Sequence, residues 1–186
     1  MFILYAIPVG IVVGLLLRGR LSGIASLQLR AGVVMVAGLW AQVLLFSTPI
    51  GDALGSAAPA AYVTSTFAVL IAILVNLRIP GLSFVAAGAA LNLLVIVANG
   101  GVMPASAAAY AEHGRAAADS YSNTALLHQP VLGILGDVVA LPTWLPGTNV
   151  ISLGDILIAI GIVTTLAVAM VRARQVPTMS IEPTTV

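Results

Sequence analysis

The chain has 186 residues, of which 60% are hydrophobic and 7% are charged, and its net charge is +1. A soluble domain has about 25% charged residues, so this composition, with a mean hydropathy of +1.13, indicates an integral membrane protein. The small net charge gives no reason to expect a nucleic-acid partner. The chain has neither cysteine nor lysine, which excludes disulfides, cysteine-ligated metals and lysine-based Schiff-base or P-loop chemistry.

Five apolar stretches are candidates to cross a bilayer as helices, which takes about 20 residues each. They cover residues 2–17, 31–50, 60–77, 82–102 and 151–171. The first is short, but a cleaved signal peptide carries its basic residues before the apolar stretch, whereas Arg18 and Arg20 follow this one. We interpret it as an uncleaved span. The sequence therefore predicts an all-α membrane protein, a bundle of five transmembrane helices.

The arginines predict the orientation of the bundle. With five spans, one side of the membrane receives Arg18, Arg20, Arg30, Arg78, Arg172 and Arg174, and the other receives Arg115. Because basic residues concentrate on the cytoplasmic side, the N-terminus is predicted outside and the C-terminus inside. Residues 1–174 then form a single transmembrane domain, with 103–150 as an extracytoplasmic segment and 175–186 as a disordered cytoplasmic tail.

The connections between the spans carry weaker signals. Residues 52–59 are predicted to be a short outer loop, and residues 18–30 fit either a brief interfacial helix or a plain connector. In the outer segment, the alanine-rich stretch 107–119 predicts a surface helix with Ser106 as its N-cap. Residues 126–145 are too polar and too broken by proline to span, and are expected to lie on the membrane or to dip into it against protein.

Asp155 lies one turn inside the last predicted span, where a charge without a partner costs a few kcal/mol. Two interpretations stay open. The sequence Ser152-Leu-Gly-Asp155 fits an acid in the first turn of a helix, where the helix dipole favours it, and it also fits a polar site inside the bundle. Gly154 and Gly161 form a stripe of small residues beside Asp155, which permits close helix packing and predicts that Asp155 faces protein.

Asn92 and Asn99 are seven residues apart on the fourth predicted span, so they share one face. Asn99 begins the run Asn99-Gly100-Gly101-Val102-Met103-Pro104, whose two glycines permit a positive φ. This pattern fits a helix C-cap with Asn92 as a contact between helices. It also fits a polar ligand site made by Asn92, Asn99, Gly100, Gly101, Met103 and Pro104.

Asp137 precedes the last span at a depth similar to that of Asp155, 18 residues later in the chain. Two carboxylates that share a site split their pKa values, and one of them can activate water. A structural pair, or two unrelated acids, fits the same pattern. Because the fourth and fifth spans run in opposite directions, we expect Asn99 and Asp137 at the same outer surface as Asp155, as its partners.

Other polar residues give little indication of chemistry. His113 and His128, with Glu112 or Asp119, are candidate metal ligands, but the sequence has no HExxH pattern and no close histidine pair. We interpret the histidines as solvated loop residues and expect neither a metal nor a cofactor. The sequence has no Walker motif, GxGxxG or GxSxG. Gln42 and Asn76 are interpreted as packing contacts within the membrane.

Three stretches together, 90–104 (ALNLLVIVANGGVMP), 135–142 (LGDVVALP) and 150–161 (VISLGDILIAIG), resemble a family of small bacterial integral-membrane proteins known only as a domain of unknown function. The resemblance covers most of the chain and implies no activity. It implies that the Asn-Gly-Gly-x-Met-Pro run and the two Gly-Asp motifs, with Asp137 and Asp155, matter to the family. It also implies a location in the bacterial inner membrane.

The two aspartates are also similar in separation and side of the membrane to those of signal peptidase II, the lipoprotein-processing aspartic protease. In that enzyme the second aspartate opens a terminal span within an Asn-x-x-Asp setting. Here Asn149 precedes Asp155 by six residues, the Asn-x-Gly-Ala-Ala-Phe run of that family is absent, and five spans are predicted instead of four. The similarity is an analogy between sites.

These observations favour a non-enzymatic membrane component that binds a lipid, a small apolar ligand or a partner subunit at the outer ends of spans four and five. The alternative is an outer-leaflet intramembrane hydrolase that uses Asp137 and Asp155 as catalytic residues. A transporter fits poorly, because five spans without an internal repeat are unusual for one. The expected partners are membrane lipids, with a membrane partner protein or a second copy of the chain as further candidates.

Overall fold

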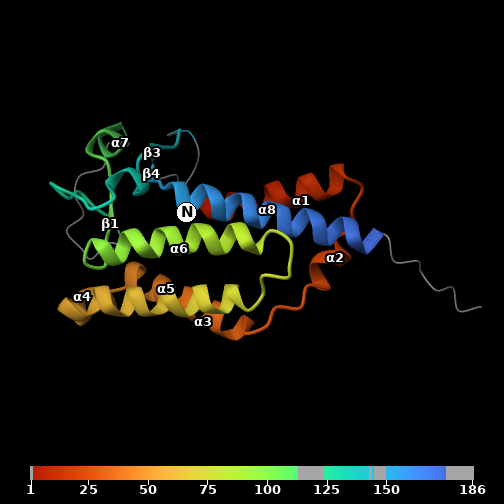
Figure 1. Cartoon of the computed structure of the whole chain (residues 1–186), viewed down its shortest axis with the longest axis horizontal. Helices are drawn as coiled ribbons and strands as arrows, with labels where there is room; N and C mark the ends of the chain where they lie inside the picture. Colours follow the sequence, from red (N-terminus) through yellow and green to blue (C-terminus); the bar gives the residue numbers. More distant parts are fainter. Residues whose placement is uncertain (1, 113–123, 143, 145–149, 175–186) are drawn as a thin grey trace, which may run out of the picture.

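Figure 1 shows the fold in a computed structural model, which describes residues 2–112, 124–142, 144 and 150–174. The described chain is mostly helical. The helices are α1 (Ala6–Leu16), α2 (Ser22–Ala25), α3 (Gly32–Ser47), α4 (Ile50–Leu54), α5 (Ala58–Leu74), α6 (Leu82–Ala98), α7 (Ala107–Glu112) and α8 (Leu153–Arg174). Short 3-10 turns lie at Phe2–Tyr5, Gly55–Ala57 and Gly133–Leu135. The strands β1 (Met103–Pro104), β2 (Thr124–Ala125), β3 (Val139–Ala140) and β4 (Val150–Ile151) have two residues each.

Each of the five predicted spans corresponds to one apolar helix: α1, α3, α5, α6 and α8. Two helical stretches, Ile50–Leu74 and Leu153–Arg174, are long and apolar enough to cross a membrane. The other apolar helices have 10–17 residues. The structure therefore confirms the helical fold and provides two candidate spans.

The predicted outer loop 52–59 is helical, which corrects the sequence analysis. Thr48 ends α3, since its hydroxyl donates to the Leu44 carbonyl at 2.6 Å and accepts from the Ile50 N–H at 3.3 Å. Pro49 comes just before α4, where a missing N–H costs no helical hydrogen bond, and Asp52 lies in the first turn of α4, where the helix dipole favours an acid. The break between α3 and α5 is thus at Thr48.

The structure contains part of the predicted surface helix, and it has a short helix in the stretch where a helix and a plain connector were both left open. The stretch 18–30 contains the single-turn helix α2, which packs against α8. The alanine-rich stretch begins as α7, and its remaining residues, 113–119, lie outside the described residues. The predicted disordered tail, 175–186, also lies outside them.

The long helices pack in a row. The extensive contacts join α1 to α8, α8 to α6, α6 to α5 and α5 to α3. Figure 1 shows α8, α6 and α5 lying one beside the next. The first and last helices of the described chain are therefore neighbours, and α8 lies between α1 and α6.

α6 and α8 approach each other backbone to backbone. A Cβ atom on Gly88 would collide with the carbonyl oxygen of Gly154, and a Cβ atom on Gly161 would collide with the side chain of Val85 and with the backbone at Gly81. Gly88 of α6 and Gly81, the residue before α6, are seven residues apart, as are Gly154 and Gly161 of α8, so the two stripes face one another along two turns. The predicted small-residue stripe on α8 is confirmed, and its counterpart is on α6.

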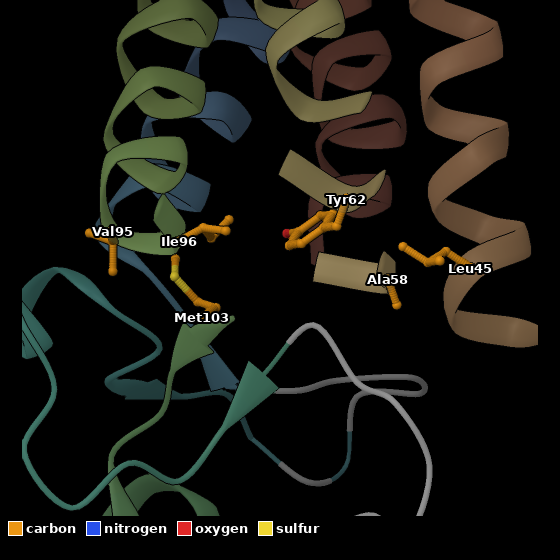
Figure 2. Packing of buried hydrophobic residues seen from close by; sticks show 6 residues of the cluster. All are labelled: Leu45, Ala58, Tyr62, Val95, Ile96 and Met103. Carbon is orange, nitrogen blue, oxygen red and sulfur yellow. The ribbon is translucent and has the colours of Figure 1, made fainter. Parts of the chain in front are cut away.

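The hydrophobic core near the C-terminal end of α6 joins four elements. Figure 2 shows its buried side chains, which come from α3, α5, α6 and β1: Leu45, Ala58, Tyr62, Val95, Ile96 and Met103. The ring of Phe46 packs edge-on against Tyr62 with centroids 4.9 Å apart. Met103 extends this core from α6 into β1, so the segment after α6 is anchored on the bundle.

One end of the row, here called the strand end, carries the short strands. β1 pairs in parallel with β2, and β3 pairs antiparallel with β4. An isolated bridge between Ala105 and Asp137 links the two ladders. The strand end also includes α4 and α7 (Figure 1).

The opposite end, here called the arginine end, brings together the α1–α2 connection, α2, the α2–α3 connection, the α5–α6 turn and the last turns of α8. The N–H of Arg20 donates to the Met170 carbonyl at 2.9 Å. The side chain of Asn76 bonds both backbone groups of Arg30, at 2.7 and 2.8 Å. These segments carry the arginines that were predicted on one side of the membrane: Arg18, Arg20, Arg30, Arg78, Arg172 and Arg174.

α6 ends in a Schellman motif, as the glycine run predicts. Gly100 has φ of 71° and Gly101 has φ of 93°. The Gly101 N–H donates to the Ile96 carbonyl at 2.8 Å, and the Gly100 N–H donates to the Val97 carbonyl at 3.3 Å, which is the hydrogen-bond pattern of this motif. The two glycines differ in surroundings, because a Cβ on Gly101 would collide with Pro59 whereas one on Gly100 would meet open space.

This difference gives a matched pair of variants. Gly100→Ala should lower the free energy of unfolding by about 1–2 kcal/mol, which is the cost of placing a residue with a Cβ atom in the left-handed conformation. Gly101→Ala should cost more, because the collision with Pro59 adds to the same backbone strain. Thermal unfolding of both variants in detergent measures the difference, and an equal loss for the two would show that Pro59 does not restrain the end of α6.

Candidate functional site

The N-terminus of α8 is closed by a capping box. The Ser152 hydroxyl accepts a hydrogen bond from the Asp155 N–H at 3.0 Å, and an Asp155 carboxylate oxygen accepts one from the Ser152 N–H at 3.3 Å. Two N–H groups that a helix N-terminus leaves unpaired are thereby satisfied. Asp155 is therefore an acid in the first turn of a helix, one of the two interpretations that the sequence left open.

Asp155 also reaches α6, so the second interpretation holds as well. The amide nitrogen of Asn92 donates to the other carboxylate oxygen of Asp155 at 2.8 Å, and the Ser152 hydroxyl donates to the Asn92 amide oxygen at 2.9 Å. These contacts close a ring of hydrogen bonds through the three side chains. The prediction that Asp155 faces protein is confirmed.

The predicted partners of Asp155 need correction, because Asn92 takes the place expected for Asn99. The glycine contact between Gly88 and Gly154 sets Asn92 one turn further along α6, beside the first turn of α8. Asn99 lies two turns beyond Asn92, past the start of α8. The identity of the partner was thus determined by the close contact between the helices.

Asn99 instead holds a loop of the outer segment. Its amide nitrogen donates to the Val131 carbonyl at 2.8 Å and to the Val95 carbonyl at 2.7 Å, and its amide oxygen accepts from the Val131 N–H at 2.9 Å. Asn76 makes the same three bonds, to Arg30 and to Ala72, at the end of α5. Each asparagine therefore fastens one distant loop residue to the end of a helix.

Asp137 lies at the junction of the two ladders and is 6% exposed. Its N–H donates to the Pro104 carbonyl and its carbonyl accepts from the Ser106 N–H, both at 2.9 Å. Its carboxyl group accepts from the Thr124 hydroxyl at 3.1 Å. Pro104 itself is fully buried, so Asp137 is held on both sides by the segment that follows α6.

Burial raises the pKa of Asp137 from its ordinary value of 3.8 to about 7. The charge of Asp155 contributes to the rise, and the hydrogen bond from Thr124 opposes it. Among the described residues the two carboxyl groups share no hydrogen bond. The aspartates are therefore near enough to interact through charge, and each has its own hydrogen-bond partners.

Four of the predicted site residues fall into two groups, and the others lie elsewhere. Asn92 and Asp155 belong to the ring at the start of α8, and Pro104 and Asp137 belong to the ladder junction. The remaining residues have positions that serve the fold: Asn99 on Val131, Gly100 and Gly101 in the helix end, and Met103 in the core.

Sequence reasoning did not identify two hydrogen-bond partners of the aspartates. For several candidate metal ligands the structure gives no outcome. Ser152 and Thr124 bond the two aspartates; the Ser-x-x-Asp spacing signals the first, whereas no local pattern signals the second. Within the described part of the chain, no group of three acidic or histidine side chains is placed to hold a metal ion. The other candidate ligands, His113 and Asp119, and also Asn149, lie outside the described residues.

Comparisons with known proteins place the chain in a family. The model of a family of unknown function, DUF5317, matches residues 26–167, a range that contains α3, α5, α6 and both aspartates. No curated protein and no solved structure matches the chain. Because the match covers most of the sequence, this protein is a member of the DUF5317 family.

Proposed function

We propose that this protein is a five-span component of the bacterial inner membrane, without enzymatic activity, that binds a lipid, a small apolar ligand or a partner subunit at the strand end. The proposed spans are α1, α3, the stretch Ile50–Leu74, α6 and α8, with the strand end outside. The observation that carries the proposal is the large number of apolar side chains that the fold leaves exposed.

Exposed apolar side chains on the shorter helices support their membrane placement. Val33 and Trp40 of α3 are 83% and 60% exposed, and Phe84 and Leu94 of α6 are also exposed. A helix that faces water carries charged and polar residues on its outer face. The grouping of arginines at one end supports the orientation, because basic residues concentrate on the cytoplasmic side.

The strand end carries an apolar surface of its own, formed by the neighbouring residues Val131, Leu132 and Ile134, and Trp144 is a further exposed apolar residue of the outer segment. Ile134 is 82% exposed and Trp144 is 78% exposed. Asn99 fastens Val131 to α6, so this surface is fixed relative to the bundle. Tryptophan is enriched where membrane meets water, and a fixed apolar surface at that depth suits contact with lipid or with an apolar partner.

Reporter fusions test the span number and the orientation. Fusions after Ser56 and near Arg115 should report an extracytoplasmic position, and fusions after Arg20, after Arg78 and at Val186 should report a cytoplasmic one. These positions alternate because the proposed spans separate them. A cytoplasmic signal near Arg115 would overturn the five-span arrangement.

Photocrosslinking tests the binding surface. A photoreactive residue at Ile134 in intact membranes should attach to lipid or to one defined protein, because this side chain projects from a fixed apolar surface. Ser56, exposed on the same proposed side, is the matched control and should attach far less. Equal yields at the two positions would contradict a specific contact at the strand end.

One observation favours hydrolysis as a second candidate function. A carboxyl group with a pKa of about 7 beside a second acid suits a pair in which one member holds a proton and the other activates water. The hydrogen bonds that occupy Asp155 and Asp137 weigh against it. A reconstituted protein that cleaves a membrane-inserted lipopeptide, with cleavage lost in Asp137→Asn, would support this candidate over the first.

A further inference from the structure

A cavity of about 260 Å³ opens at the arginine end, between the α2–α3 connection, the α5–α6 turn and the last turns of α8. Its lining combines polar with apolar side chains, including Gln28, Arg78, Ile79, Val168 and Arg172. The volume is below the range of about 300–1,000 Å³ that is usual for drug-sized ligands, so the cavity suits a headgroup-sized molecule or part of a larger one.

The walls of the cavity are held by contacts between distant parts of the chain. Thr165 donates to the Pro80 carbonyl at 2.9 Å, which joins α8 to the α5–α6 turn. Asn76 joins that turn to Arg30, and the Ser26 hydroxyl closes the end of α2 by donating to Gly23 at 2.8 Å. All three walls are thus fixed without a ligand.

The cavity concentrates positive charge that nothing in the described chain balances. Neither guanidinium, that of Arg78 or that of Arg172, makes a hydrogen bond or an ion pair with a described residue. Of the described acids, Asp52 lies in α4, Asp137 at the bridge to Ala105 and Asp155 in the first turn of α8, and none of them lines the cavity. Two arginines that flank one hollow are suited to an anion, since the planar guanidinium can bind phosphate oxygens in pairs.

We propose that this cavity binds the phosphate group of an anionic phospholipid, with Arg78 and Arg172 on the phosphate oxygens and Gln28 beside them. The apolar lining, Ile79 and Val168 among it, favours a lipid over free phosphate because it suits a glycerol backbone and the start of an acyl chain. Leu77 and Val75, both exposed, lie in the same α5–α6 turn as Arg78, and they offer apolar surface to the acyl chain. Basic pockets between helices on the cytoplasmic side are suited to such headgroups.

The inference rests on the membrane placement proposed above, but it concerns the end of the bundle opposite to the strand end. It can therefore fail while the reporter fusions still show five spans, and the two failures are distinguishable.

The test uses the full chain in neutral detergent. Thermal unfolding is followed during titration with short-chain phosphatidylglycerol, with short-chain phosphatidylcholine and with inorganic phosphate. The unfolding temperature should rise with phosphatidylglycerol and stay unchanged with the other two. Arg78→Gln and Arg172→Gln should each raise the concentration for half the effect by roughly tenfold, as expected when a charge-assisted hydrogen bond is lost.

Arg174→Gln is the matched control, because it removes an arginine two residues along α8, about 200° around the helix axis from Arg172, and outside the cavity lining. It should respond to phosphatidylglycerol as the unmodified protein does. Arg78→Lys keeps the charge and loses the planar fork, so it should bind more weakly, and it replaces Arg78→Gln if that variant does not fold.

Three outcomes would overturn the inference. One is the absence of any response to phosphatidylglycerol, and another is an equal response in the cavity variants and in Arg174→Gln, which would indicate general attraction to the arginine end. The third is an equal rise in unfolding temperature with inorganic phosphate, which would assign the cavity to a free anion.

Discussion

Asp155→Leu is expected to lower the free energy of unfolding by about 2–6 kcal/mol. The substitution leaves the Asn92 amide and the Ser152 N–H without their acceptor, and each such group costs about 1–3 kcal/mol when water does not replace the lost partner. Both lie between α6 and α8, where the helices are in backbone contact. Thermal or denaturant unfolding in detergent measures the loss.

Asp155→Asn tests the same ring with the shape preserved. An asparagine side chain has one acceptor oxygen, so its amide nitrogen must face either the Asn92 nitrogen or the Ser152 N–H. The loss should be smaller than for leucine. A double-mutant cycle of Asp155→Ala with Asn92→Ala should give a coupling energy of about 0.5–3 kcal/mol; a value near zero would show that the ring does not stabilise the protein.

Asp137→Asn is expected to make the protein more stable at pH 8, by about 4 kcal/mol, and to change it little at pH 4. The pKa of Asp137 is raised in the folded protein, from 3.8 to about 7. Between these values the folded state binds more protons than the unfolded state, so stability falls as pH rises, by about 1.4 kcal/mol per pH unit. The stability that the proton on Asp137 contributes is fully present below pH 4 and is lost above pH 7.

The amide that Asp137→Asn introduces would be neutral at every pH and would keep a polar partner for Thr124. The difference between the two proteins therefore isolates this group from other titrating residues. Unfolding measured from pH 4 to pH 9 should give curves that separate between pH 4 and pH 7. Parallel curves would show that Asp137 does not carry the proton.

The two substitutions are linked through the charge of Asp155, which contributes to the raised pKa of Asp137. At pH 5 Asp137 holds its proton, so Asp155→Asn loses hydrogen bonds without relieving any repulsion. At pH 8 the same substitution also relieves the repulsion between the two carboxylates, so Asp155→Asn should cost less stability there. A cost that is equal at both pH values would show that the two acids do not interact.

The positions of the long helices could be predicted from sequence because apolar runs between arginines and glycines leave few alternatives. The helix end at Gly100 and Gly101 could also be predicted, since φ values near +70° and +90° are open to glycine. The helical character of 50–57 could not, because Thr48 ends α3 through two hydrogen bonds that propensity does not reveal.

The pairing of polar residues was predicted in part. That Asp155 faces protein follows from the cost of burying it and from the stripe at Gly154 and Gly161. Its partner is Asn92 because of the axial position of α8 against α6. Gly88 of α6 determines that position through its contact with Gly154 of α8. The bond from Thr124 to Asp137 depends on the pairing of β1 with β2 and on the bridge between Ala105 and Asp137. Strands of two residues have no sequence period to detect.

The packing of α1 against α8 has a consequence for the order in which the protein is assembled during synthesis. α1 leaves the ribosome first, and α8, which forms its extensive contacts, leaves last among the described helices. The glycines of α1 that meet the side chains of Leu166 and Met170 have no such contact until then. A nascent chain stopped before α8 therefore has α1 without the helix that it packs against, and the final packing of α1 waits for α8.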